Sequence, residues 1–265
     1  MKIGILQCDD VHESLQPAHG NYPDMFERAL RAVLPDCELP VYRVLDGQLP
    51  ASVDECDAWL ITGSKFGVND GLPWIDDLCE LVRTLWQHKR PLLGVCFGHQ
   101  LMARALGGSV VKSDKGWGLG LSFNQVIERK AWMQPYQPHL DLLVSHQDQV
   151  VTLPPQGQVL ASSEFCPYYL VQYGDCFISV QGHPEFCPGY ARDLMQMREA
   201  ILPPARLRAA LASLKTEADS QLMLQWLVRF LQTAAQGERL ATISPLKYIS
   251  RRKVRPQRGS KLVSR

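Results

Sequence analysis

A cysteine framed by two glycines is the residue of this sequence best placed to do chemistry. Cys96 has Gly94 two positions before it and Gly98 two positions after it. The run Leu92-Leu93-Gly94-Val95 predicts a strand, and the residues from about Phe97 to Leu106 predict a helix. A nucleophile on such a tight strand-to-helix turn needs small neighbours, since bulky side chains would collide with the crossing backbone. The helix N-terminus would also favour the thiolate form of Cys96 over the thiol.

A histidine and a carboxylate far downstream could serve this sulfur. The segment Gly182-His183-Pro184-Glu185 follows a β-type run from Phe177 to Gln181. Pro184 stiffens the backbone, so Glu185 could accept a hydrogen bond from one ring nitrogen of His183 while the other faces the sulfur. On its own this segment is more often a turn with a solvated acid. Its weight as a catalytic pair depends on Cys96.

Together, Gly-Val-Cys-Phe-Gly-His-Gln at 94–100 and Gly-His-Pro-Glu at 182–185 resemble the motifs of the class I glutamine amidotransferases, in that family's order and spacing. The likeness extends from residue 1 to about residue 200 and is similar to a stand-alone, GMP-synthase-like glutaminase domain. It implies a flavodoxin-like α/β fold. It also implies that Cys96 attacks the side-chain amide of glutamine, releasing ammonia and forming a γ-glutamyl thioester. His183 would act as general base and then acid, and Glu185 would orient it.

The same resemblance suggests an oxyanion hole. Leu60-Ile61-Thr62-Gly63-Ser64 follows a predicted strand, where the family's oxyanion loop lies. The backbone N–H groups of Gly63 and Phe97 would then stabilise the negative oxygen that develops during attack. This loop departs from the Gly-Gly-Pro form of biosynthetic synthetases, and its Thr-Gly-Ser sequence looks like the variant of stand-alone members.

Three further residues match substrate-binding positions of the family. Gln100 matches a position that holds the α-amino and α-carboxylate end of glutamine, and Ser145 and His146 belong to a Ser-His-x-Asp segment near the same site. The alternatives are that Gln100 only caps or packs on its helix and that Asp148 only fixes a turn. The remaining histidines show no metal-ligand spacing, so we expect no metal site and no cofactor.

Short apolar runs alternate with amphipathic segments in the first half of the chain, and this pattern predicts the elements that position these residues. Strands are expected at 2–6, 41–45, 58–61 and 92–95, and helices at 25–33, 73–88 and 97–106. This order predicts a three-layer α/β fold, with a mostly parallel central sheet and helices on both faces. Residues 109–182 predict antiparallel additions, and residues 188–235 predict helices. The active site should lie at the carboxyl ends of the strands.

The composition excludes several classes of protein. The 265 residues are 46% hydrophobic and 21% charged, unlike a disordered chain. No apolar run approaches the roughly 18 residues that span a bilayer, and the start becomes acidic at Asp9, so we expect neither a membrane span nor a signal peptide. Eight scattered cysteines include no C-x-x-C pair. We expect reduced thiols in a cytoplasmic protein, with the seven other than Cys96 buried in the core.

Charge is distributed unevenly along the chain. Residues 236–265 hold nine Lys or Arg and one acidic residue, whereas residues 1–235 hold 19 basic and 26 acidic residues. We therefore expect one domain at 1–235 and a basic C-terminal extension at 236–265. Because the extension lacks interleaved aromatic residues, it is more often a solvated segment than a nucleic-acid partner.

Three functions follow from the sequence. The first is a glutamine amidotransferase or glutaminase, in which ammonia passes to a synthetase partner, since the chain shows no Ser-Gly-Gly-x-Asp-Ser loop for ATP chemistry. The second is a γ-glutamyl peptidase acting on γ-glutamyl peptides or glutathione conjugates. The third is a non-catalytic binding module on the same fold, which would have no need of Cys96, His183 and Glu185 together.

Overall fold

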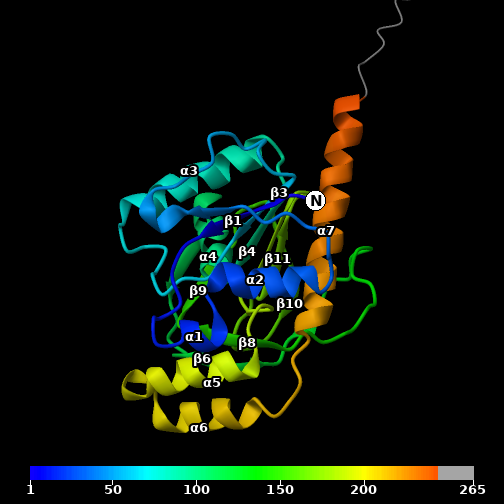
Figure 1. Cartoon of the computed structure of the whole chain (residues 1–265). Coiled ribbons are helices and arrows are strands. Elements are labelled where there is room, and N and C mark those ends of the chain that lie inside the picture. Colours follow the sequence, from blue (N-terminus) through cyan, green and yellow to red (C-terminus); the bar gives the residue numbers. More distant parts are fainter. Residues whose placement is uncertain (244–265) are drawn as a thin grey trace, which may run out of the picture.

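Eight strands form one central sheet in the order β2-β1-β3-β4-β12-β11-β10-β7 (Figure 1). The computed structural model describes the backbone of residues 1–243 and the side chains of residues 1–237. The first five strands of this order run parallel to one another. They are β2 (Val41–Arg43), β1 (Ile3–Gln7), β3 (Ala58–Ile61), β4 (Leu92–Val95) and β12 (Phe177–Val180).

The other strands pair antiparallel, as the middle of the sequence predicts. The sheet continues through β11 (Leu170–Tyr173), β10 (Gly157–Ser162) and β7 (Gln125–Val126). Two separate ribbons join β5 (Ser109–Lys112) to β9 (Asp148–Thr152) and β6 (Gly118–Ser122) to β8 (Leu142–His146). The sheet is therefore mostly parallel with an antiparallel extension.

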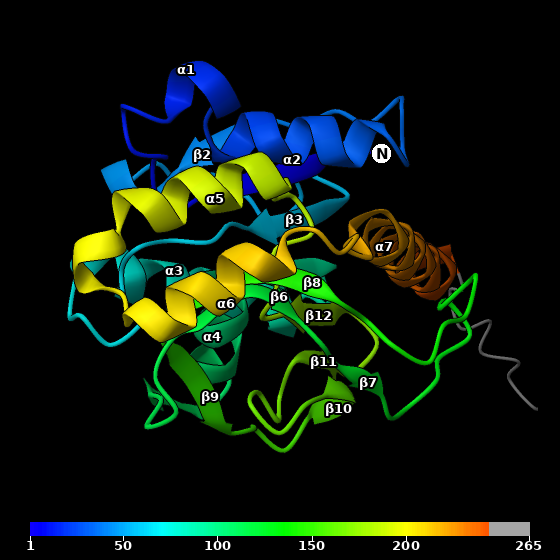
Figure 2. The same cartoon turned by 90° about the horizontal axis from the view of Figure 1, so that it is seen from below.

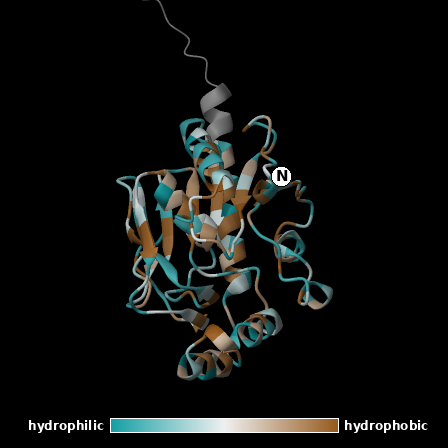
Figure 3. Cartoon of the chain, turned by 90° about the vertical axis from the view of Figure 1, so that its left-hand side faces the viewer, coloured by the Kyte–Doolittle hydropathy of each residue, from teal (hydrophilic) through white to brown (hydrophobic). Residues whose placement is uncertain are grey.

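Helices cover both faces of the sheet (Figure 2). On one face, the buried side chains of α2 (Tyr22–Arg31) and α7 (Ser220–Ile243) share a core cluster with Leu93 and Val95 of β4. On the other face, α3 (Pro73–Gln87) and α4 (Phe97–Ala105) share a second cluster with Leu92. Figure 3 shows the hydrophobic residues concentrated in the strands between these helices. The predicted three-layer α/β fold is confirmed.

A third apolar cluster lies at one end of the sheet. It packs α5 (Pro188–Met197) and α6 (Pro204–Ser213) against the β6–β8 ribbon. Figure 1 shows these two helices together below the sheet. Three short helical segments complete the described chain: α1 (Gln16–His19), η1 (Val44–Asp46) and η2 (Glu199–Ile201). α5 follows β12, so this cluster borders the carboxyl ends of the parallel strands.

Two details differ from the sequence-based expectations. The strand expected at 41–45 ends at Arg43, because the chain turns there into η1 and then bends at Gly47, whose φ is +79°. The last helix continues through position 236 to Ile243. The division into a domain at 1–235 and a basic extension stays a prediction, and residues 244–265 lie outside the described chain.

All eight cysteines are free thiols. Seven are buried, and the expectation that Cys187 is buried is wrong because it begins α5 at the surface. Its sulfur accepts a hydrogen bond from the Tyr190 backbone N–H at 3.4 Å, so Cys187 caps the helix. Among the described helices, none is long and apolar enough to cross a membrane.

Candidate active site

The turn between β4 and α4 holds Cys96 in a conformation that non-glycine residues rarely adopt. Its φ is +52° and its ψ is −98°. A Cβ on Gly94 would lie 2.6 Å from the carbonyl oxygen of Gly98, and a Cβ on Gly98 would lie 2.6 Å from that of Ile61. Both distances are too short for a side chain. The prediction that this turn needs small neighbours is confirmed.

His183 is brought to this turn by β12, the strand beside β4. Its backbone N–H donates to the carbonyl oxygen of Leu143 in β8 at 2.8 Å. Its ring stacks on Phe186, with centroids 3.8 Å apart and planes 7° apart. The ring is therefore held from the backbone on one side and from its face on the other.

Glu185 and Cys96 both interact with the His183 ring. Nδ1 of His183 lies 2.7 Å from Oε1 of Glu185, and both side chains are buried. Burial alone would favour the neutral ring, but the charges of Glu185 and Cys96, with hydrogen bonds to both, raise the pKa of His183 to about 10. The structure thus brings together all three residues that the sequence singled out, in the order sulfur, imidazole, carboxylate.

The loop after β3 lies directly against this trio. A Cβ on Gly63 would lie 2.9 Å from Cε1 of His183 and 3.8 Å from Cβ of Cys96. The loop is fixed to the end of β1, because the Thr62 hydroxyl accepts from the Cys8 backbone N–H at 3.0 Å. Phe97 is the first residue of α4, so its N–H has no intrahelical acceptor. This placement supports the predicted oxyanion pair Gly63 and Phe97, whose role stays a prediction.

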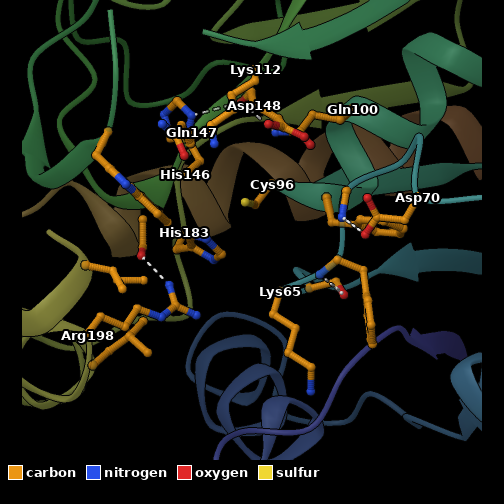
Figure 4. Close-up of a pocket in the computed structure, with 18 of the residues that line it drawn as sticks. Lys65, Asp70, Cys96, Gln100, Lys112, His146, Gln147, Asp148, His183 and Arg198 are labelled. Carbon is orange, nitrogen blue, oxygen red and sulfur yellow. Dashed lines mark hydrogen bonds between the residues drawn. The ribbon is translucent and has the colours of Figure 1, made fainter.

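A pocket of about 760 Å³ opens above Cys96 and contains the three predicted substrate-binding residues (Figure 4). Nε2 of Gln100 donates to the carbonyl oxygen of Asp148 at 2.8 Å and to Oε1 of Gln181 at 3.2 Å. Nδ1 of His146 donates to the same Asp148 carbonyl at 3.1 Å. Burial lowers the pKa of His146 to about 4, so its ring is neutral at pH 7. Gln100 and His146 therefore hold the backbone that carries Asp148, besides facing the pocket.

Several charged residues of the pocket were not found from the sequence. Lys65 follows the Gly63 loop, Asp70 and Lys112 line the side where Gln100 lies, and Arg198 caps the C-terminus of α5. Nη1 of Arg198 donates to Oγ of Ser145 at 3.1 Å, the third predicted substrate contact. Lys65 could have been found from its place in the loop. Arg198 has no local signal, because only the packing of α5 brings it to the pocket.

Within residues 1–237, no group of three or more His, Cys, Asp or Glu side chains is arranged to hold a metal ion. The chemistry that the pocket can support with its own side chains is nucleophilic attack by the Cys96 sulfur. His183 is placed to move a proton during that attack.

Comparisons with known proteins agree with this geometry. The family model described as "Glutamine amidotransferase class-I" matches residues 27–200. Gamma-glutamyl peptidase 3 of Arabidopsis thaliana is 33% identical over 187 residues, covering 68% of this chain and 74% of that protein. The glutamine-hydrolyzing subunit of a GMP synthase from Sulfolobus acidocaldarius is 32% identical over 132 residues, covering 49% of this chain and 68% of that protein.

The fold is also found among solved structures. A glutamine amidotransferase from Thermotoga maritima superposes with a TM-score of 0.68 and 18% identity, covering 88% of this chain and 96% of that one. At this identity the match is one of fold.

Proposed function

The chain belongs to the class I glutamine amidotransferase family, and we propose that it hydrolyses γ-glutamyl amide bonds with Cys96 as the nucleophile. One observation carries the proposal. Cys96 is held on a strained turn beside His183, whose ring is paired with the buried Glu185 at 2.7 Å. Backbone strain is kept at functional positions more often than elsewhere, which argues against a non-catalytic binding module.

The first half of the reaction forms a thioester. The Cys96 sulfur attacks the γ-carbonyl carbon, and the backbone N–H groups of Gly63 and Phe97 donate to the oxygen that becomes negative. The protonated His183 ring gives its proton to the nitrogen as the C–N bond breaks. The amine leaves, and the γ-glutamyl group remains on the sulfur.

The second half restores the enzyme. Neutral His183 accepts a proton from a water molecule that attacks the thioester carbonyl, the C–S bond breaks and glutamate leaves. The ring regains its protonated state beside the sulfur. Glu185 stabilises that state throughout, since its carboxylate raises the pKa of the ring. The sum is one amide and one water converted to glutamate and an amine.

Two leaving groups fit this reaction. From glutamine the product is ammonia, which would pass to a synthetase partner of the kind named for the Sulfolobus acidocaldarius relative. From a γ-glutamyl peptide the product is an amino acid or a shorter peptide. The pocket of about 760 Å³ has room beyond a bound γ-glutamyl group, and the Arabidopsis thaliana relative is named as a γ-glutamyl peptidase. These two observations favour γ-glutamyl peptides.

The test offers the purified protein glutamine and a panel of γ-glutamyl peptides and measures glutamate release, with ammonia followed in parallel for glutamine. We expect turnover of at least one of them, and its loss in Cys96→Ala with the fold unchanged by circular dichroism. Cys187→Ser is the matched control, since this exposed cysteine lies outside the pocket and serine also caps helices. Turnover that persists in Cys96→Ala would disprove the mechanism.

A further inference from the structure

The two sides of the pocket differ in charge. Asp70 and Asp148 lie with Gln100 on one side of Cys96, and Arg198 lies on the other (Figure 4). Burial and the nearby charge of Asp70 raise the pKa of Asp148, an effect that Lys112 opposes. Acidic side chains on the Gln100 side suit the ammonium of a γ-glutamyl group. The leaving group would then extend toward Arg198.

The charge of Arg198 is not neutralised by the protein. Its guanidinium donates to Oγ of Ser145 at 3.1 Å, and it forms no ion pair with a carboxylate of residues 1–237. Lys65, the other cation on this side of Cys96, is paired with Asp9 at 3.0 Å. Arg198 is half-buried, so its charge is less screened by water than that of an exposed arginine.

The position of Arg198 is fixed by its helix and its neighbours. Its backbone N–H donates to the carbonyl oxygen of Leu194 at 3.2 Å, which ends α5. Leu194, Met197 and Ile201 line the same wall of the pocket, and Met197 and Ile201 are 40% and 67% exposed although they are apolar. This wall therefore offers one cation surrounded by apolar surface.

A carboxylate attached to an apolar group matches this wall. The planar guanidinium can donate two parallel hydrogen bonds to a carboxylate, and such charge-assisted bonds are about twice as strong as neutral ones. The leaving group of a γ-glutamyl amino acid carries a carboxylate and a side chain. Ammonia, the leaving group of glutamine, carries neither.

We propose that Arg198, supported by Ser145, is a specificity-determining residue that binds the carboxylate of the leaving group. The proposal rests on the proposed function. The preferred substrates are then γ-glutamyl amino acids or peptides with a free C-terminal carboxylate, and an apolar side chain next to it packs on Met197 and Ile201.

The first test compares γ-glutamyl-leucine with γ-glutamyl-leucinamide, which differ only in that carboxylate. The wild type should have the higher kcat/KM for the acid relative to the amide, and Arg198→Gln should lower this ratio roughly tenfold to hundredfold, the range for losing a hydrogen bond to a charged group. Because the intrinsic reactivity of each substrate is the same for every variant, the change in ratio isolates the carboxylate. Arg192→Gln is the matched control, since this exposed arginine of α5 is outside the pocket. An unchanged ratio in Arg198→Gln would overturn the proposal.

The second test does not depend on turnover. Calorimetric titration of Cys96→Ala, which cannot form the thioester, should show tighter binding of γ-glutamyl-leucine than of its amide, and combination with Arg198→Gln or Ser145→Ala should reduce that difference. Equal binding of both compounds by Cys96→Ala would refute a carboxylate subsite even if the wild type hydrolyses them. A wild type that hydrolyses neither compound nor glutamine would instead refute the proposed function, and the binding difference would still decide the role of Arg198.

Discussion

The carboxylate of Glu185 has a single partner, and this governs the behaviour of the imidazole. Oε1 binds Nδ1 of His183, whereas Oε2 is buried without a hydrogen-bond partner among the described residues. A buried charge that is not shared with other donors acts strongly on the one group beside it. The ring of His183 is therefore tuned by two neighbours, Glu185 and Cys96, and by little else.

Replacing His183 tests its role as the proton carrier. His183→Asn keeps a polar side chain of similar size but cannot exchange a proton at neutral pH, so we expect turnover to fall by about 10²–10⁴-fold. Steady-state rates of glutamate release measure this, with Cys187→Ser as the reference. A loss below tenfold would place proton transfer on another group.

The glycine of the oxyanion loop is constrained by the same ring. In Gly63→Ala the new Cβ would lie 2.9 Å from Cε1 of His183, so the ring or the loop must shift. We expect a large drop in kcat, since displacements on this scale disturb catalytic alignment, with little change in the free energy of unfolding because only one contact is affected. Rates and urea denaturation measured together separate these effects. Normal kcat would show that the loop is not held against the ring.

Three adjacent strands supply the catalytic groups from their carboxyl ends. Gly63 follows β3, Cys96 follows β4 and His183 follows β12, and these strands are neighbours in the sheet. Their parallel pairing fixes the three loops relative to one another. The leaving-group wall comes instead from α5, which packs on the β6–β8 ribbon rather than on the sheet.

The close approach of α4 to β3 gives a prediction at this scale. Gly98→Ala would place a Cβ 2.6 Å from the carbonyl oxygen of Ile61, which cannot move without disturbing the sheet. We expect the free energy of unfolding to fall by about 1–3 kcal/mol, as for other overpacked sites. Gly237→Ala in α7 has open space around its Cβ and should be neutral or stabilising. Urea unfolding of both variants gives the comparison, and equal stability would contradict the tight contact.

The elements that the sequence predicted well are those with a strong local pattern. The run from β3 through α3, β4 and α4 was recognisable because each strand is apolar throughout and each helix carries an apolar stripe. The pairing of β5 with β9 and of β6 with β8 could not be predicted, since it joins segments with little periodicity across long stretches of chain. Arg198 was missed for the same reason: its meaning comes from where α5 packs.

At the scale of the whole molecule, two buried histidines make stability depend on pH. Burial lowers the pKa of His99 to about 3 and that of His146 to about 4, from an ordinary value of 6.5. Below pH 6.5 the unfolded chain binds protons that the folded chain does not, so stability falls as the pH falls toward 4. His183, with its raised pKa, acts in the opposite sense: its contribution is present below pH 6.5 and is lost as the pH rises toward 10.

Denaturation at several pH values tests this balance. We expect the free energy of unfolding to decrease between pH 6.5 and pH 4.5, with each buried histidine contributing at most about 1.4 kcal/mol per pH unit. His146→Gln should make the dependence shallower. A slope in His146→Gln as steep as in the wild type would mean that this ring is protonated in the folded state.

Because the catalytic groups and the α5 wall belong to different apolar clusters, substrate choice and bond cleavage can change independently. Mutations along α5 would accumulate without loosening the elbow, so descendants of one ancestral hydrolase could diversify their substrates through this helix alone. Randomising Leu194, Met197 and Ile201 in a selected library is accordingly the direct route to engineered variants that accept other amines.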